Sequence, residues 1–277
     1  MYQPRILTIQ DISCFGKCSL TVALPIISAM GVETVILPTA ILSTHTGGFS
    51  GFTFRDLTDD VEPITAHWKK ENIGFDGIYT GYLGSARQLE LVGKIFDENP
   101  DAFRLVDPVM ADNGKLYTGF TEEFAAGMAK LCAKADIIVP NLTEACFMLK
   151  KPYPASYDLD YVKDTLKELC GMGCKTAIIT GVLSADGKQQ GAVAYDSGKD
   201  EFTSYYSENL DAKYHGTGDI FSSALCGAIV LGKPIDEALR IAVEYTVACI
   251  RKSMPDKEHK YGVRFEECIP TLVDLIK

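Results

Sequence analysis

Short runs of β-branched and apolar residues alternate with longer segments of helical period through the first 180 residues. Six runs have the composition of strands and cover residues 5–9, 34–37, 77–80, 103–106, 137–139 and 176–180. Several are apolar throughout, which is typical of strands buried on both faces of a parallel sheet. Helical segments are expected at residues 19–30, 56–72, 85–98, 121–133, 142–150 and 160–171. These repeated units predict an α/β fold, a doubly wound three-layer sandwich with a mostly parallel central sheet.

The pattern changes after residue 180. Two alternating runs, residues 191–195 and 201–206, flank Asp196-Ser197-Gly198, so we expect a hairpin and antiparallel C-terminal strands. Two further helices are predicted at residues 217–231 and 236–253. Because no linker, repeat or low-complexity run interrupts the sequence, a single domain is expected over residues 1–277.

The composition limits the compartment and the partners. With 47% hydrophobic and 23% charged residues, the chain has the composition of one large globular domain. Its apolar runs are far shorter than the ~20 residues that span a bilayer, and it begins with no charged and apolar leader. A formal net charge of −10 argues against nucleic acid or an anionic membrane as a partner. Nine cysteines in apolar contexts indicate reduced thiols, so a cytoplasmic protein is expected.

Two cysteine pairs have a spacing that could serve a metal, namely Cys14 with Cys18 and Cys170 with Cys174. A closed zinc site needs four ligands. No histidine clusters beside either pair in the sequence, so a structural zinc is not expected. The four histidines are His45, His67, His215 and His259.

The segment 214–225 runs from a glycine-containing turn into an apolar helix. Gly216 and Gly218 let a ligand approach the backbone without a Cβ in the way, and the N–H groups that begin the helix favour an anion. Asp219 follows this turn, and a carboxylate there could take the proton from a hydroxyl that attacks a phosphoryl group. The structural alternative is an ordinary N-cap, in which Thr217 or Asp219 serves only the first turn.

Segments with polar residues follow all six predicted strands, at residues 10–13, 39 with 43–48, 81–84, 107–114, 140–144 and 180–181. Ligands of a doubly wound sheet bind beyond the carboxyl ends of its strands, so these positions together indicate a binding site. Each also has a structural interpretation. Asn141 and Thr143 are good helix caps, Asp112-Asn113-Gly114 is a good turn, and Tyr82 is suited to cover an edge of the core.

Six motifs lie in a characteristic order along the chain. They are Gln10-Asp11, Thr44-His45-Thr46-Gly47, Gly81-Tyr82-Leu83-Gly84, Asp107-Pro108-Val109-Met110-Ala111-Asp112, Asn141-Leu142-Thr143-Glu144 and Gly216-Thr217-Gly218-Asp219. This series resembles the pyridoxal and pyridoxine kinases of the ribokinase superfamily over essentially the whole chain. The last motif marks the superfamily alone, whereas Gly-Tyr-Leu-Gly and Asp-Pro-Val-Met point to the vitamin B6 kinases. Hydroxymethylpyrimidine kinases share much of the rest.

The resemblance implies ATP-dependent phosphorylation of the 5′-hydroxymethyl group of pyridoxal, pyridoxine or pyridoxamine. Asp219 would be the catalytic base, and the backbone of Gly216, Thr217 and Gly218 would form the anion hole. The nucleotide-binding positions would be Asp107, Asn141, Glu144, Thr180 and Gly181. The metal positions would be Asp107, Asp112 and Glu144. The substrate-binding positions would be Asp11, His45, Thr46 and Tyr82.

The resemblance further implies MgATP as the phosphoryl donor, a monovalent cation such as K⁺ as an optional cofactor, and a homodimer. Its partners would be the small-molecule substrate and ATP, with neither nucleic acid nor membrane. Phe49, Phe52 and Phe54 fall at near-alternate positions after the His45 motif. They would either plug a flap or form a contact patch on a partner subunit.

Three features depart from the family pattern. Asp11 stands where many relatives have serine, and it would either shift preference among the B6 vitamers or close its own turn. The flap residues Lys115-Leu116-Tyr117 include no cysteine, so a covalent thiohemiacetal with the substrate aldehyde is not expected. His215 would either reach a phosphate or cap the preceding strand.

Two alternatives to a B6 kinase stay open at this point. One is a sister kinase for another hydroxymethyl heteroaromatic compound, such as hydroxymethylpyrimidine. The other is a non-catalytic ligand-binding protein that has kept the fold. Such a protein is expected to have damaged catalytic positions, whereas Asp219, Asp107 and Glu144 are all present.

Overall fold

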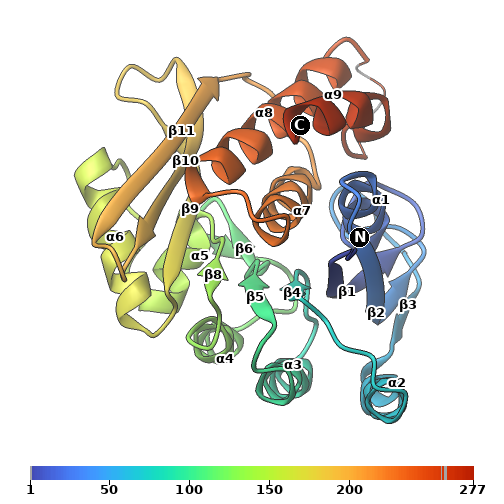
Figure 1. Cartoon of the computed structure of the whole chain (residues 1–277). Helices are drawn as coiled ribbons and strands as arrows, with labels where there is room; N and C mark the ends of the chain where they lie inside the picture. Colours follow the sequence, from blue (N-terminus) through green and yellow to red (C-terminus); the bar gives the residue numbers. More distant parts are fainter. Residues whose placement is uncertain (1, 257, 259–260) are drawn as a thin grey trace. The chain divides into compact units, whose positions relative to one another are not determined.

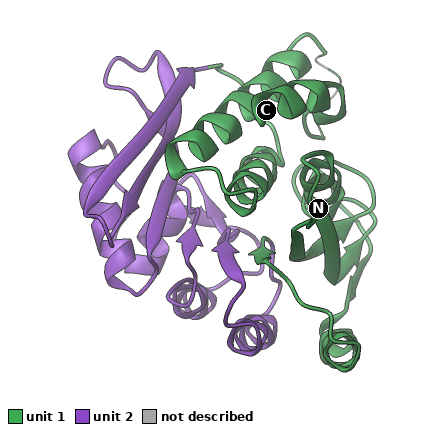
Figure 2. Cartoon of the chain, in the orientation of Figure 1, with its two compact units in different colours: residues 1–81, 210–277 green, residues 82–209 purple. Residues whose placement is uncertain are grey.

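The computed structural model describes residues 2–256, 258 and 261–277. The chain divides into two compact units, shown in separate colours in Figure 2. Unit 1 comprises the chain up to Gly81 together with Leu210–Lys277, and unit 2 comprises Tyr82–Asn209. Because unit 1 joins the two ends of the chain, residues far apart in the sequence can meet in it. The single domain expected over residues 1–277 remains a prediction.

The strands of unit 1 lie in the order β4, β1, β2, β3. The central strand β1 (Arg5–Ser13) pairs in parallel with β2 (Glu33–Leu42) and β4 (Gly77–Thr80), as labelled in Figure 1. The short strand β3 (Phe54–Asp56) pairs antiparallel with β2 and was not predicted, because its three residues are exposed and lack an apolar period.

The helices of unit 1 come from both ends of the chain. They are α1 (Leu20–Ala29), α2 (Thr58–Lys70), α7 (Thr217–Val230), α8 (Ile235–Ser253), the 3₁₀ helix η1 (Phe265–Cys268) and α9 (Ile269–Leu275). Helix α7 packs against α1 and α8 and is buried on most of its surface, as its nearly continuous apolar sequence predicts. Its first turn is thereby held firmly in place.

The strands of unit 2 lie in the order β5, β8, β9, β10, β11. The first three are parallel, and their bounds are Phe103–Val106, Ile137–Ile138 and Thr176–Leu183. The last two, Gln189–Asp196 and Glu201–Glu208, continue as an antiparallel hairpin. The change from parallel to antiparallel pairing is confirmed, and it falls where the sequence pattern changes.

Four helices and a small hairpin complete the described part of unit 2. The helices are α3 (Ala86–Glu98), α4 (Glu122–Cys132), α5 (Leu142–Leu149) and α6 (Leu159–Gly171). The hairpin joins β6 (Ala111–Asp112) to β7 (Lys115–Leu116). Each helix begins at a polar N-cap whose side chain accepts a hydrogen bond from the first turn; these caps are Ser85, Thr121, Asn141 and Asp158.

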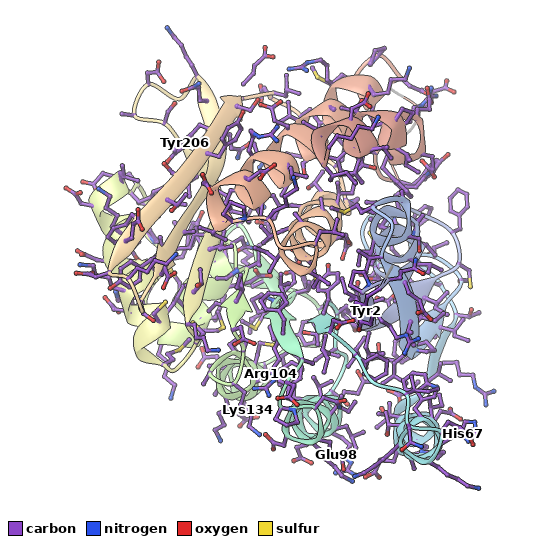
Figure 3. All side chains as sticks on the ribbon, viewed as in Figure 1. Tyr2, His67, Glu98, Arg104, Lys134 and Tyr206 are labelled. Carbon is purple, nitrogen blue, oxygen red and sulfur yellow. The ribbon has the colours of Figure 1, made fainter. Side chains whose placement is uncertain are left out.

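Arg104 ties the start of β5 to the end of α4 in unit 2, and both ends of this contact are labelled in Figure 3. Its Nη1 donates a hydrogen bond to the carbonyl of Lys134 at 3.3 Å, while the Lys134 ammonium pairs with Asp97 of α3. These bonds fix the amino end of β5, so its carboxyl end delivers Asp107 to a defined position.

Most predicted elements are present, and their bounds differ from the predicted ones by a few residues. The sequence analysis did not predict the hairpin of β6 and β7, or the C-terminal elements η1 and α9. Within the described residues, no helix is long and apolar enough to cross a membrane.

Candidate active site

The turn before α7 belongs to unit 1 and has a glycine as its N-cap. Gly216 adopts a left-handed conformation, with φ of 78°, and a Cβ on it would lie 1.7 Å from the carbonyl oxygen of Lys17. Only glycine satisfies both conditions. The predicted alternative of Thr217 or Asp219 as the N-cap is therefore wrong: both residues lie inside the helix. Among the described residues, no side chain caps the start of α7, and uncapped N–H groups at a helix start suit an anion.

Asp219 lies in the first turn of α7 and is half-buried. The Ser223 hydroxyl donates a hydrogen bond to its backbone carbonyl. Position in the first turn favours the carboxylate, because the N-terminal end of a helix carries partial positive charge. Burial raises the pKa of the nearby Cys18 thiol, and the charges of Asp219 and Asp11 raise it further. This part of unit 1 therefore holds two carboxyl groups around a neutral thiol.

Asp11 lies near the carboxyl end of β1, where the pairing with β2 is irregular. Its Oδ2 accepts a hydrogen bond from the Ser13 hydroxyl at 2.9 Å, and its Oδ1 accepts one from the Ser19 hydroxyl. Burial raises the pKa of the Asp11 carboxyl, and the two hydroxyls oppose that rise. Asp11 thus closes the turn between β1 and α1, which is the structural role that the sequence analysis offered for it.

His45 lies in the loop after β2 and is 4% exposed. Its Nε2 lies 3.1 Å from the carbonyl oxygen of Tyr261, and its ring centroid is 5.0 Å from that of Phe49. Burial lowers the pKa of His45, and the charge of His215 lowers it further, while the Tyr261 carbonyl raises it. Thr46 is exposed beside it.

Four buried polar atoms lie at or just beyond the carboxyl ends of the strands in unit 1 and have no hydrogen-bond partner among the described residues. They are Oε1 of Gln10, Oγ1 of Thr44, Nδ1 of His45 and Oγ1 of Thr80. Buried polar atoms in native proteins normally have a partner, so each of these four atoms calls for water or a ligand. Gln10 and Thr44 lie in the polar segments that the sequence analysis assigned to a binding site, but only His45 of the four was given a role there. Thr80 was missed, although its place as a polar residue at the end of a predicted strand was a signal that could have found it.

In unit 2, Asn141 and Glu144 form a capping box at the start of α5. The Asn141 Oδ1 accepts a hydrogen bond from the Glu144 N–H at 3.0 Å, and the Glu144 Oε2 accepts one from the Asn141 N–H at 2.9 Å. The Glu144 Oε1 also accepts from the Met110 N–H, and the Asn141 Nδ2 donates to the Ala111 carbonyl. The predicted cap is thus confirmed, and it joins α5 to the segment after β5.

Asp107 and Glu144 are both buried, at 5% and 3% exposure. Burial raises the pKa of Glu144 well above its usual range, and the neighbouring charge of Asp107 raises it further. Two like charges in one buried place are unfavourable unless a proton or a cation neutralises them. The pair therefore suits a site for a divalent cation, which prefers oxygen ligands.

Asp112 is the last residue of β6, directly before the turn to β7, and is exposed. Its carboxylate accepts hydrogen bonds from the backbone and side-chain nitrogen atoms of Asn113. Asn113 and Gly114 both have positive φ, as a two-residue hairpin of this type requires. The predicted turn is confirmed, and the metal role of Asp112 remains a prediction.

Thr180 and Gly181 lie within β9, and Thr180 forms a bridge with Asn141. The pairing of β9 with β10 is irregular at this point, and Gly181 has a φ of 73°. Tyr82 packs against Phe120, with ring centroids 5.6 Å apart. This packing agrees with its predicted structural role, and its substrate role remains a prediction.

Among the described residues, no three His, Cys, Asp or Glu side chains gather in a way that could hold a metal ion. Mg²⁺ usually keeps several waters and takes only one or two carboxylates from a protein, so the acidic pair still fits it. His259, one of the histidines considered for zinc, lies outside the described residues.

The predicted site residues therefore fall into two groups. Unit 1 brings the loops of Asp11, His45 and Thr46 to the turn of Gly216, Thr217, Gly218 and Asp219. Unit 2 brings Asn141 and Glu144 together with Thr180 and Asp107. Lys17 and Tyr261, which contact the unit 1 group, were not predicted, because no local signal connects them to it.

Known proteins resemble this chain over most of its length. The family model described as phosphomethylpyrimidine kinase matches residues 23–264. Pyridoxal kinase PdxY of Aliivibrio fischeri is 29% identical over 272 residues, which are 91% of this chain and 89% of that protein.

Two solved structures share the fold. A candidate phosphomethylpyrimidine kinase of Bacteroides thetaiotaomicron, crystallised with pyridoxal, is 37% identical with a TM-score of 0.92, covering 98% of this chain and 96% of that one. The pyridoxal kinase of Lactobacillus plantarum is 29% identical with a TM-score of 0.90, covering 98% and 97%.

The fold and these matches define an ATP-dependent kinase with a ribokinase-like fold. The expected fold class is thereby confirmed, and the non-catalytic alternative loses its support. The chain belongs to the phosphomethylpyrimidine kinase family, because the model of that family matches all of the chain except its two ends.

Proposed function

We propose that this kinase transfers the γ-phosphoryl group of ATP to the 5′-hydroxymethyl group of pyridoxal, pyridoxine or pyridoxamine. The observation that carries the proposal is the combination, in unit 1, of two features: a helix start with no side-chain cap that bears Asp219, and four buried polar atoms near the strand ends without a partner among the described residues. The first feature suits a phosphoryl group. The second suits a small polar ring, because hydroxyl and ring-nitrogen groups would satisfy those atoms.

Unit 1 would bind and activate the alcohol. His45 would supply its unsatisfied Nδ1 to the substrate ring, and Thr46 and Asp11 would complete the contacts proposed for unit 1. Tyr82, the first residue of unit 2, is also proposed as a substrate contact. Asp219 would accept the proton of the hydroxymethyl group as its oxygen attacks phosphorus. The N–H groups of Gly216, Thr217 and Gly218 would hold the charge on the phosphoryl oxygens during transfer.

Unit 2 would bind the nucleotide. Asn141, Glu144, Thr180 and Gly181 would contact its phosphates, and Asp107, Asp112 and Glu144 would hold Mg²⁺ directly or through water. When bound, Mg²⁺ neutralises charge on the phosphates and orients them. The buried acidic pair supports this assignment, because a cation relieves the repulsion between Asp107 and Glu144. A requirement for K⁺ is part of the same proposal and rests on family resemblance alone.

A second candidate substrate is hydroxymethylpyrimidine, which the family description favours. Both compounds present a hydroxymethyl group on a nitrogen heteroaromatic ring, so the same base and anion hole would serve both. Pockets for such rings differ by a few contacts, each worth ~1–3 kcal/mol.

Purified protein with MgATP tests the proposal. We expect the three B6 vitamers to gain one phosphoryl group, measured by mass spectrometry, with kcat/KM for at least one of them above that for hydroxymethylpyrimidine. Asp219→Asn is the matched control for a contaminating kinase. Phosphorylation of hydroxymethylpyrimidine alone would transfer the assignment to the second candidate.

We also propose a cytoplasmic homodimer. Phe49 packs on Phe15 and His45 within its own chain, which fits the first alternative for the aromatic residues, a flap filled from inside. Phe54 on β3 is 48% exposed and is available for a contact with a second subunit. Sedimentation at micromolar concentration should give about twice the chain mass of 30.3 kDa. A species near the chain mass would contradict the dimer.

A further inference from the structure

His215 precedes the anion-binding turn and packs onto the His45 loop. The centroids of the two imidazole rings lie 5.2 Å apart, with an angle of 45° between their planes. A Cβ built on Gly47 would lie 2.4 Å from Cε1 of His215, so the loop backbone fits closely against this imidazole. His215 is exposed, whereas His45 is buried. Neither role suggested by the sequence, a phosphate contact or a strand cap, describes this packing.

His45 is held from several directions. Tyr261 contacts it through a carbonyl oxygen, Phe49 packs edge-on against its ring, and Gly16 leaves room for its Cδ2. His215 is the contact that comes from the segment leading directly into Gly216. It therefore links the loop of the proposed substrate site to the turn that carries the catalytic base.

We propose that His215 is a positioning residue that holds the 43–49 loop in register with the turn before α7. The inference rests on the proposed function and adds a specificity device to it. With the imidazole in place, His45 and Asp219 keep the separation that a bound hydroxymethyl ring needs. Without the His215 imidazole, the 43–49 loop loses one of its packing contacts, and the substrate ring is bound less tightly.

The first test is His215→Ala. We expect KM for the preferred B6 vitamer to rise about threefold to tenfold, the range that the loss of one ring–ring contact gives. KM for ATP should stay within about twofold. His215→Phe should restore most of the vitamer affinity, because a flat ring again covers His45. The matched control is His67→Ala, which removes an exposed histidine from α2 (Figure 3) and should leave both KM values unchanged.

Gly47→Ala provides the second arm. Gly47 does not have a positive φ, so alanine adds only a methyl group that collides with the imidazole. We expect a vitamer KM as high as that of His215→Ala. In the double variant of Gly47→Ala and His215→Ala, the imidazole is gone and the added methyl group has nothing to collide with. The two rises in vitamer KM should therefore not add. Additive effects would overturn the proposal, as would equal rises in KM for the vitamer and for ATP.

Hydrogen exchange of the ligand-free protein separates this inference from the proposed function. We expect backbone amides of residues 43–49 to exchange faster in His215→Ala than in wild type, and at the wild-type rate in His67→Ala. Unchanged exchange in His215→Ala would overturn the inference even in an active kinase. If wild type phosphorylates no vitamer, the proposed function fails, while faster exchange would still establish the contact.

Discussion

The hydroxyl of Ser19 donates a hydrogen bond to Oδ1 of Asp11 and so joins the end of β1 to the residue before α1. Ser19 has a φ of 56°, which is uncommon for a residue with a side chain. The bond from Ser13 occupies the other carboxylate oxygen. The short loop between β1 and α1 is thus organised around one buried carboxyl group.

Replacing this carboxyl group should destabilise the fold. We expect Asp11→Ser to lower the free energy of unfolding by about 1–3 kcal/mol, because two buried hydroxyl groups lose their acceptor. Chemical denaturation measures this change, with Ser50→Ala in the exposed part of the next loop as the control. A second readout is the ratio of kcat/KM values among the three vitamers. A shift in this ratio above about threefold would indicate that Asp11 also contacts the substrate ring. A uniform loss of kcat/KM for all three vitamers would leave Asp11 with the structural role alone.

The pH dependence of stability should carry a contribution from His45. Its pKa in the folded protein lies below the ordinary value of 6.5, so the unfolded chain binds the proton more readily. The contribution to stability is therefore present above pH 6.5 and is lost as the pH falls through the folded pKa. We expect His45→Gln to make the unfolding free energy fall less steeply on acidification. His67→Gln, at an exposed position, should keep the wild-type slope.

Asp219→Asn tests the proposed base. We expect the fold and ATP binding to persist while kcat falls about 10²- to 10⁴-fold, the usual contribution of a positioned general base. Steady-state kinetics and calorimetry of nucleotide binding give the two readouts. Retention of more than about a third of the wild-type kcat would remove Asp219 from this role.

The acidic pair of unit 2 should set the metal requirement. We expect Glu144→Gln and Asp107→Asn each to raise the Mg²⁺ concentration needed for half-maximal activity, because each removes negative charge that favours a cation. ADP affinity measured without metal should change little. Glu144→Gln also keeps a side-chain oxygen as an acceptor for the capping box, which limits the loss of stability. An unaltered Mg²⁺ requirement in both variants would return these residues to structural roles.

Local signals in the sequence predicted much of the fold. The alternation of strands and helices, the hairpin after residue 180 and the cap at Asn141 all depend on residues close together in the chain. The elements that were missed are short. Strand β3 has three residues, and α9 has seven, so neither shows a clear period.

The candidate site was predicted in part, for a related reason. Glycines, caps and polar strand ends mark positions such as Gly216 and Asn141, because backbone geometry limits which residues fit there. The neighbours of those positions come from elsewhere in the chain. Tyr261 meets His45 across 216 residues, and nothing in the residues around either position predicts that contact.

The sequence by itself therefore determined the order of strands and helices, the glycine turn before α7 and the residue types available for chemistry, since these follow from short-range geometry and hydrophobic period. Only the tertiary structure decided what each polar group contacts. It placed the Asp11 carboxyl between two serine hydroxyls, set His215 over Gly47, and buried Glu144 near Asp107. Packing brings distant segments together, and burial then sets the cost of each charge, neither of which can be read along the chain.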